Sequence, residues 1–138
     1  MFKKMLKNER GLTLIELLAV VVILGIIAAI AVPSISGIIK SSKQDAIITE
    51  ASQIIDAAKL YVTNDEPAFT SNALTITKST AGFDKYLDTS SNFTVKVTET
   101  NGKFTYSITG HKINSITSIS AFTDTDGATE AEIKANLN

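Results

Sequence analysis

The sequence predicts an α+β protein in which a long N-terminal helix packs by its outer half against a small antiparallel β-sheet. Three observations lead to this prediction. Residues 17–39 form an uncharged apolar stretch, a helical stripe of apolar residues continues to Val62, and two segments of alternating apolar and polar residues flank an Asn-Gly pair further on. At 138 residues, 44% of them hydrophobic, the chain has the length of one domain.

The apolar stretch is long enough to cross a membrane. A helix over residues 17–39 would be roughly 35 Å long, and the hydrocarbon core of a bilayer is about 30 Å thick. The segment before Gly11 carries four Lys or Arg residues and one Glu, and positive charge beside a hydrophobic span stays in the cytoplasm. We therefore expect a single-pass protein of the cytoplasmic membrane whose C-terminal domain faces outward.

The basic segment ends in Gly11, and the residues LTLIELL follow directly and lead into the apolar stretch. This arrangement resembles the prepilin signature of type IV pilins, pseudopilins and competence pilins over about residues 1 to 40. The resemblance implies that a prepilin peptidase cuts between Gly11 and Leu12, that the new N-terminus is methylated, and that the helix is kept for assembly. Leu12 departs from the family, which most often has phenylalanine there. The implied fold is the pilin fold, with a leader at 1–11, a transmembrane and assembly helix at 12–39, its amphipathic continuation at 40–63 and a β-rich domain at 64–138.

Glu16 lies at the start of the apolar helix, where a carboxylate is costly to bury in lipid. Cleavage after Gly11 would create an ammonium group on Leu12, one helical turn away, and the two charges can pair within one helix or between neighbouring subunits. We expect Glu16, with Thr13 next to the new terminus, to set the register of assembly. The alternative is that Glu16 lies passively at the level of the lipid headgroups.

Two residues of the apolar helix weaken it. Pro33 removes one backbone hydrogen bond, and Gly25 has no side chain to restrict the backbone. We expect the helix to bend or partly unwind between them when it leaves the bilayer for a filament, and a passive kink is the alternative.

Beyond the membrane the helix is amphipathic, and an Asn-Asp-Glu-Pro sequence at 64–67 is expected to end it. The apolar stripe consists of Ile47, Ala51, Ile54, Ile55, Ala58, Tyr61 and Val62. Alternating residues predict strands around 93–97 and 104–108, joined by a hairpin turn at 100–102 because Asn-Gly tolerates positive φ. Weaker signals predict strands at 74–77 and 113–119, one helical turn at 82–88, and a final short helix that begins with a capping box at Thr129.

Few residues point to chemistry. Asp124 and Asp126, in an Asp-Thr-Asp-Gly loop, are weak candidates for calcium binding, although they miss the EF-hand spacing. His111 is the only histidine, and we expect it to be exposed at a strand edge. The chain has no cysteine, which excludes thiol nucleophiles and thiol-bound metals. We predict no cofactor, no sequence-specific nucleic-acid binding and no enzymatic activity.

The sequence thus predicts a structural subunit of a type IV pilus-like filament that serves adhesion, motility or DNA uptake. The expected partners are further copies of the chain, other pilins, the prepilin peptidase and methyltransferase, the inner-membrane assembly machinery, and membrane lipid before assembly. Three alternatives remain: a pseudopilin of a type II secretion or competence system, a tethered binding module that never polymerises, and a small secreted protein released after Ala31.

Overall fold

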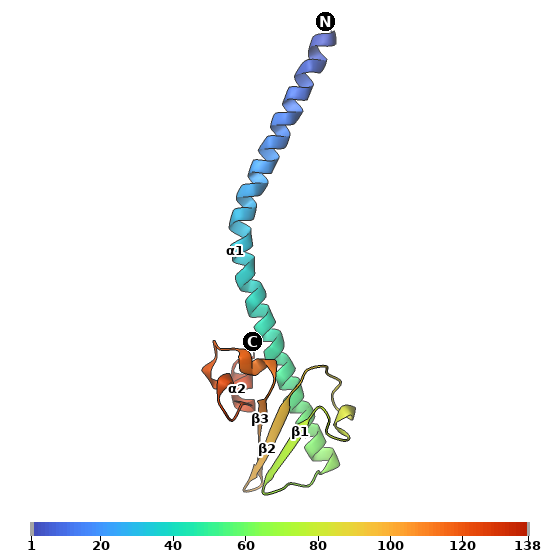
Figure 1. Cartoon of the computed structure of the whole chain (residues 1–138), viewed down its shortest axis with the longest axis vertical. Helices are drawn as coiled ribbons and strands as arrows, with labels where there is room; N and C mark the ends of the chain where they lie inside the picture. Colours follow the sequence, from blue (N-terminus) through green and yellow to red (C-terminus); the bar gives the residue numbers. More distant parts are fainter. Residues whose placement is uncertain (1, 138) are drawn as a thin grey trace. The chain divides into compact units, whose positions relative to one another are not determined.

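A computed structural model describes the backbone of residues 2–137 and the side chains of residues 13–137 (Figure 1). The chain divides into two compact units, Met1–Ser41 and Ser42–Asn138. Helix α1 (Phe2–Asp65) supplies the first unit and continues into the second. The predicted α+β fold is confirmed, since this long helix precedes a four-stranded antiparallel sheet.

From Leu17 to Ile39, within the first unit, α1 carries no charged residue and is apolar on every side. The helix runs through Pro33 as one continuous ribbon (Figure 1). Ser36 Oγ donates a hydrogen bond of 3.1 Å to the carbonyl oxygen of Val32, directly before the proline. Proline breaks helices in water because it lacks an N–H and crowds the carbonyl four residues earlier, yet here helical structure persists on both sides.

In the second unit α1 presents one apolar face to the sheet. Six of the seven residues of the predicted stripe are buried, Ile47 is partly buried, and Ile48 and Ala57 extend the stripe. The helix ends at Asp65, two residues before Pro67, as the sequence predicts. Each large aliphatic side chain buried in this way contributes about 1.5–3 kcal/mol to stability, so this half of the helix is part of the core of the second unit.

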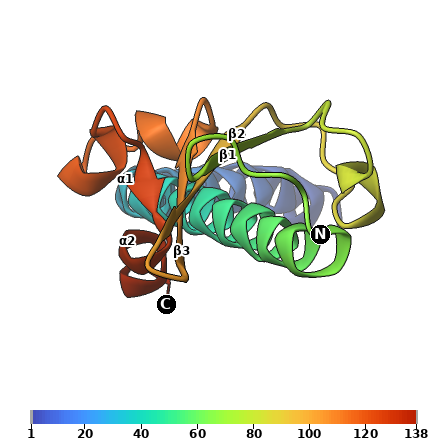
Figure 2. The same cartoon turned by 90° about the horizontal axis from the view of Figure 1, so that it is seen from below.

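The sheet has the strand order β1-β2-β3-β4, with every neighbouring pair antiparallel. Its strands are β1 (Ala73–Thr77), β2 (Thr94–Thr100), β3 (Lys103–Thr109) and β4 (Ala128–Thr129). The predicted hairpin is confirmed: Thr100 pairs with Lys103, and Asn101 and Gly102 form the turn with φ of 53° and 75°. Figure 2 shows the sheet lying along α1.

One cluster of buried residues joins the sheet to α1. On the inner face of β2 and β3 the side chains of Val95, Val97, Tyr106 and Ile108 are buried. The predicted helical turn at 82–88 is the 3₁₀ helix η1 (Phe83–Lys85), which places Phe83 in this core at 1% exposure. The ring of Phe83 contacts those of Tyr61 and Phe93 at centroid distances of 5.8 and 5.7 Å.

The strand predicted at 113–119 is wrong. This segment contains the 3₁₀ helix η2 (Lys112–Ser115) and a turn, and η3 (Ser120–Thr123) follows it. Ile113, Ile116 and Ile119 recur every third residue, which fits the three-residue period of a 3₁₀ turn and not the two-residue period of a strand. Ile113 and Ile116 are accordingly buried on the same side of the backbone turn.

The predicted final helix is confirmed as α2 (Glu130–Ala135). Thr129 caps it: its Oγ1 accepts a hydrogen bond from the backbone N–H of Glu132, and the carboxylate of Glu132 accepts one from the backbone N–H of Thr129 at 2.8 Å. Ile133 anchors the helix in the core at 1% exposure. Figure 2 shows α2 beside β3.

Candidate functional site: the assembly helix and its supporting contacts

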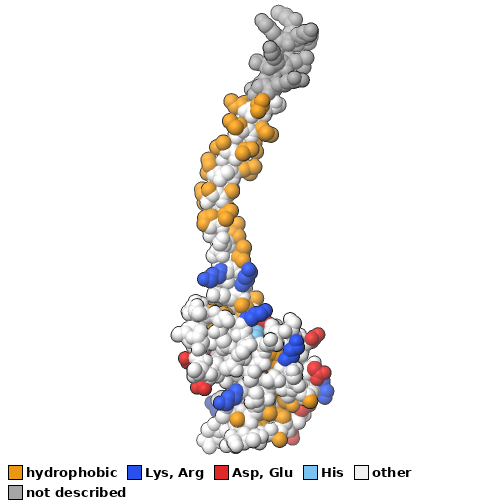
Figure 3. Space-filling model, in the orientation of Figure 1, with side chains coloured by type: hydrophobic (Ala, Val, Ile, Leu, Met, Phe, Trp, Pro, Cys, Tyr) orange, Lys and Arg blue, Asp and Glu red, His pale blue; other side chains and the backbone are white. Residues whose placement is uncertain are grey.

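The most extensive exposed apolar surface in the described residues belongs to the first unit. Its large aliphatic side chains point outward along α1, from Leu14 at 72% exposure to Ile39 at 49% (Figure 3). Thr13–Asp65 is the one helix of the described part of the chain that is long and apolar enough to cross a membrane. An exposed surface of this extent requires lipid or other apolar helices around it.

The residues predicted to control processing and register lie at the start of this helix. Gly11 and Leu12 fall outside the residues whose side chains the structure describes, so the predicted cleavage site and the pairing of the new terminus stay predictions. Thr13 and Glu16 are both exposed on α1. Glu16 is therefore a carboxylate at the beginning of a continuous apolar surface, with its side chain open to a neighbouring molecule.

Gly25 and Pro33 both lie inside the continuous helix. A Cβ atom added at Gly25 would meet nothing within 4 Å, so no close packing within the chain requires a glycine there. Glycine in the middle of a helix is less stable than alanine by about 0.5–1 kcal/mol, so the helix is weaker at this position. The bending or unwinding of this segment during assembly stays a prediction.

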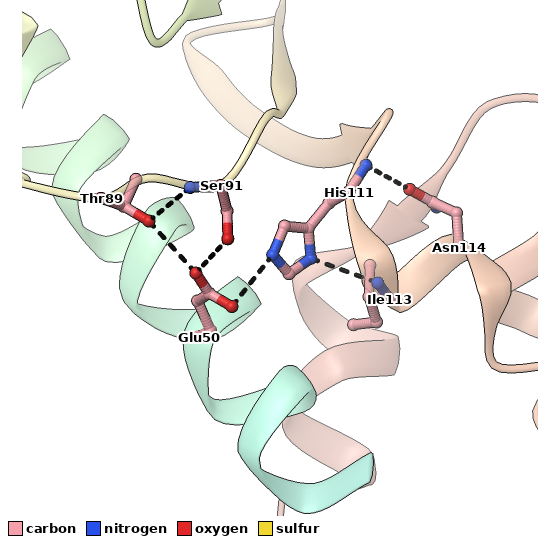
Figure 4. Close-up of polar contacts among 6 residues, drawn as sticks. All are labelled: Glu50, Thr89, Ser91, His111, Ile113 and Asn114. Carbon is pink, nitrogen blue, oxygen red and sulfur yellow. Dashed lines mark hydrogen bonds and ion pairs between the residues drawn. The ribbon is translucent and has the colours of Figure 1, made fainter. Parts of the chain in front are cut away.

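A polar network on the second unit connects α1 to the loop before β2 and to the segment after β3 (Figure 4). Glu50 of α1 accepts hydrogen bonds from Ser91 Oγ at 2.6 Å and from Thr89 Oγ1 at 3.1 Å through its Oε1 atom. Its other oxygen, Oε2, lies 3.5 Å from Nε2 of His111. Two separate loops are thus held against the same carboxylate.

The prediction that His111 is exposed is wrong, because its side chain is fully buried. Its Nδ1 accepts a hydrogen bond of 3.2 Å from the backbone N–H of Ile113, while the side chain of Asn114 accepts one of 3.1 Å from the backbone N–H of His111. Because Nδ1 is an acceptor, the proton of the neutral ring lies on Nε2, toward Glu50. The signal that the sequence offered was the spacing of His111 and Asn114, which is that of a capping box.

The pKa values of the two titratable groups in this network, His111 and Glu50, both lie below their ordinary values. Burial lowers the pKa of His111, with a smaller lowering effect from Lys112, and the nearby Glu50 carboxylate opposes them. The hydrogen bond from Ser91 lowers the pKa of Glu50 against the effect of burial, and Thr89 and His111 lower it further. At neutral pH the pair is therefore a carboxylate facing an uncharged imidazole.

The network has a serine, a carboxylate and a histidine, but in the wrong order for nucleophilic catalysis. An imidazole that activates a hydroxyl has to accept the hydroxyl proton. Here the Ser91 hydroxyl donates its proton to Glu50. The acceptor nitrogen of His111, Nδ1, already accepts a hydrogen bond from the backbone N–H of Ile113. The arrangement supports loop positions and offers no activated nucleophile.

A second polar cluster ties α2 to α1. Glu130 of α2 forms ion pairs with Lys59 of α1 and with Lys134 one turn further along α2. The Lys59 ammonium also lies 5.7 Å from the centroid of the Tyr106 ring. Burial opposes the ionisation of Glu130, but the hydrogen bonds and charges of the two lysines outweigh it and lower its pKa.

The two calcium candidates are not joined by further ligands. Asp124 and Asp126 are exposed around the turn before β4, where the backbone N–H of Gly127 donates to the carbonyl of Asp124 at 3.0 Å. Within the described residues, no group of three or more His, Cys, Asp or Glu side chains is placed to hold a metal ion. The structure therefore adds no ligand to the two aspartates.

The structure thus has an exposed apolar helix, with Glu16 near the start of its described side chains, followed by a small antiparallel sheet, and this is the arrangement of a pilin-like fold. The comparison with family models agrees with this class. Residues 6–32 match the prokaryotic N-terminal methylation motif, the class III signal peptide of type IV pilins, and this match supports a type IV pilin or pseudopilin. No match was found among curated proteins or among solved structures.

Proposed function

We propose that this chain is a structural, non-enzymatic subunit of a type IV pilus-like filament. A prepilin peptidase cuts the membrane-inserted precursor between Gly11 and Leu12, and the new N-terminus is methylated. The inner-membrane assembly machinery then transfers the subunit into a filament of identical chains and other pilins. The apolar helices form the filament core, and the second unit lies on the cell-surface side.

The observation that carries this proposal is the uncovered apolar surface of α1 together with the methylation motif. Side chains from Leu14 to Ile39 are half to three-quarters exposed. At about 25 cal/mol for each Å² of apolar surface, burying several such side chains contributes many kcal/mol for each subunit. Lipid covers this surface before assembly, and neighbouring helices can cover it afterwards.

Glu16 gives the assembled helices a register. An ammonium group and a carboxylate at about 4 Å attract each other by about 4 kcal/mol at an effective dielectric constant near 20, before desolvation is subtracted. Apolar side chains pack without strong preference for one axial position. A charge pair between neighbouring subunits therefore distinguishes the correct axial position from one shifted by a helical turn.

The first test is the mass and N-terminal sequence of the protein from membranes and from material sheared off the cell surface. We expect a sheared fraction that begins at methylated Leu12. A processed chain confined to the envelope, without long filaments, would indicate a pseudopilin. A chain that still begins at Met1 would contradict the proposal and favour the tethered module.

The second test compares two exposed carboxylates of α1. Glu16→Gln and Glu16→Ala should leave the precursor stable and processed but lower the filament yield at least about tenfold, which corresponds to about 1.4 kcal/mol. Asp45→Ala, in the second unit, is the matched control and should assemble normally. Equal filament yields from the Glu16 and Asp45 variants would refute the register function.

A further inference from the structure

Half of strand β3 has a free edge. Strand β4 pairs only with Ser107 and Ile108, so the part of β3 from Lys103 to Tyr106 has no neighbouring strand on that side among residues 2–137. Backbone groups of an antiparallel strand point alternately to its two sides. Because Lys103 pairs with Thr100 across a two-residue turn, Phe104 and Tyr106 direct their N–H and C=O groups away from β2, toward the free side.

A groove of about 610 Å³ follows this edge, between β3 and the start of α2. Its volume lies within the range of about 300–1,000 Å³ that is common for binding sites. At the hairpin end of the groove Phe104 is 41% exposed, and its ring stacks on that of Phe69 at a centroid distance of 5.4 Å. In the described part of the second unit the exposed large hydrophobic residues are Leu60, Phe104 and Leu137, and of these Phe104 alone lines the groove.

Positive charge exceeds negative charge along the groove. Its charged lining residues are Lys96, Lys103, Lys134, Asp126 and Glu130. Glu130 is already paired with Lys134 and with Lys59 from α1. The unpaired charges that face an incoming chain are thus those of Lys96 and Lys103, against one aspartate.

These charges select the occupant. Lys103 lies on β3 and Lys96 on the neighbouring strand β2. A lysine beside a free strand edge repels a second copy of the same edge, which is how many proteins prevent sheet-to-sheet aggregation. The same lysines attract carboxylates, and the free N–H and C=O groups of Phe104 and Tyr106 match those of an extended backbone. A nucleic acid would use the lysines but would leave these backbone groups without complementary partners.

We propose that the free edge of β3 binds an extended acidic peptide segment of a partner protein by strand addition. The segment forms backbone hydrogen bonds with Phe104 and Tyr106, places one side chain on the ring of Phe104, and directs carboxylates toward Lys96 and Lys103. All the residues that line this groove belong to the second unit, and none belongs to the exposed apolar stretch of α1.

The test uses the full chain in detergent micelles and three fluorescein-labelled ten-residue peptides, measured by fluorescence anisotropy. One peptide alternates Thr and Glu, one alternates Thr and Lys, and one carries the same glutamates with proline at the threonine positions. We expect the Thr-Glu peptide to bind at least about tenfold more tightly than either of the others, because only it combines the charge with a strand-forming backbone. Equal binding of the proline peptide would overturn the proposal, since it would show attraction of any polyanion.

Variants locate the binding site. Lys103→Glu should weaken binding of the Thr-Glu peptide at least about fivefold, while Lys78→Glu, an exposed lysine outside the groove, should not change it. Phe104→Ala removes the aromatic contact, and Phe104→Pro also removes the outward N–H, so the proline variant should bind more weakly than the alanine variant. Circular dichroism of each variant checks that the sheet is intact.

Hydrogen exchange distinguishes strand addition from charge attraction. The peptide should slow exchange in the segment 103–106 and leave the segment 94–100 of β2 unchanged. Peptide binding without this protection would refute strand addition, and so would equally tight binding of a single-stranded oligonucleotide that abolishes peptide binding. The chain is unassembled in this assay. A failure to bind the Thr-Glu peptide would therefore leave the proposed filament function untouched, and a failure to form filaments would leave the peptide-binding proposal untouched.

Discussion

Replacing Gly127 by alanine should destabilise the second unit strongly, because two separate costs coincide there. Gly127 has a φ of 82°, which costs a residue with a side chain about 1–2 kcal/mol. A Cβ atom at this position would also lie 2.4 Å from the carbonyl oxygen of Ile108 and 2.4 Å from Cγ2 of Thr109. The first of these neighbours is backbone of β3 and has no rotamer that relieves the overlap, so β4 has to move away from β3.

Displacement of β4 affects more than one contact. Ala128 would leave the core, where it is fully buried, and Thr129 would move the capped start of α2. Partial exposure of Ile133 on α2 adds about 1–2 kcal/mol, since complete burial of an isoleucine contributes about 1.5–3 kcal/mol. Together with the backbone cost of about 1–2 kcal/mol, we expect a loss of about 2–4 kcal/mol.

Gly102→Ala is the matched control. Gly102 has a similar φ of 75°, but a Cβ atom there would meet nothing within 4 Å. We expect only the backbone cost of about 1–2 kcal/mol. The difference between the two variants therefore isolates the close approach of β4 to β3.

The assay is thermal unfolding of the full chain in detergent micelles, followed by near-ultraviolet circular dichroism of the tyrosines. Tyr61 and Tyr106 are buried in the second unit, so their signal reports on its packing and not on the apolar helix. One kcal/mol corresponds to about 4–8 °C for a domain of this size, which predicts a fall of more than about 8 °C for Gly127→Ala. Equal shifts for the two variants would refute the argument from close approach.

Two further predictions concern the polar contacts. The pKa of His111 lies below its ordinary value of 6.5, so the unfolded chain binds a proton first, and stability should decrease as pH falls below about 6.5, by at most about 1.4 kcal/mol for each pH unit. The lowered pKa of Glu50 predicts a further loss below its ordinary value of 4.5. Urea unfolding between pH 7 and about 3 measures both, and His111→Gln should remove the first decrease; an unchanged slope in that variant would exclude His111 as its cause. Thr129→Ala should cost about 1 kcal/mol through loss of the helix cap, measured by the same unfolding assay with the exposed Thr125→Ala as control, and identical stabilities of the two variants would contradict the role of the cap.

The parts of the fold that the sequence predicted are those set by local periodicity. The stripe through Ile54 and Ala58 follows the helical period, and the alternation of Val95 and Val97 follows the period of a strand. The hairpin turn was predictable because Asn101-Gly102 accepts positive φ at both positions. In each case a few neighbouring residues contain the whole signal.

The two predictions that the structure contradicts have different causes, one local and one distant. The segment 113–119 is rich in isoleucine, which favours a strand, but the spacing of three between its isoleucines fits the 3₁₀ turn that His111 and Asn114 begin. His111 itself is buried, and the carboxylate opposite its ring belongs to Glu50, far earlier in the chain. A lone histidine in a sequence carries no information about such a partner, and an exposed position is the expectation without it.

The buried histidine also explains how a cysteine-free second unit keeps its irregular C-terminal part in place. After β3 the chain forms two short 3₁₀ helices, a two-residue strand and a short helix, and elements of this length are not stable alone. Contacts with α1 hold them at three levels along the helix: Gln44 with Ser118, Glu50 with His111, and Lys59 with Glu130. Each contact joins residues more than sixty positions apart in the sequence, so the three together hold this part of the chain against α1 in the folded state. Burial opposes protonation of His111, and this part of the chain should therefore lose order as the pH falls below about 6.5.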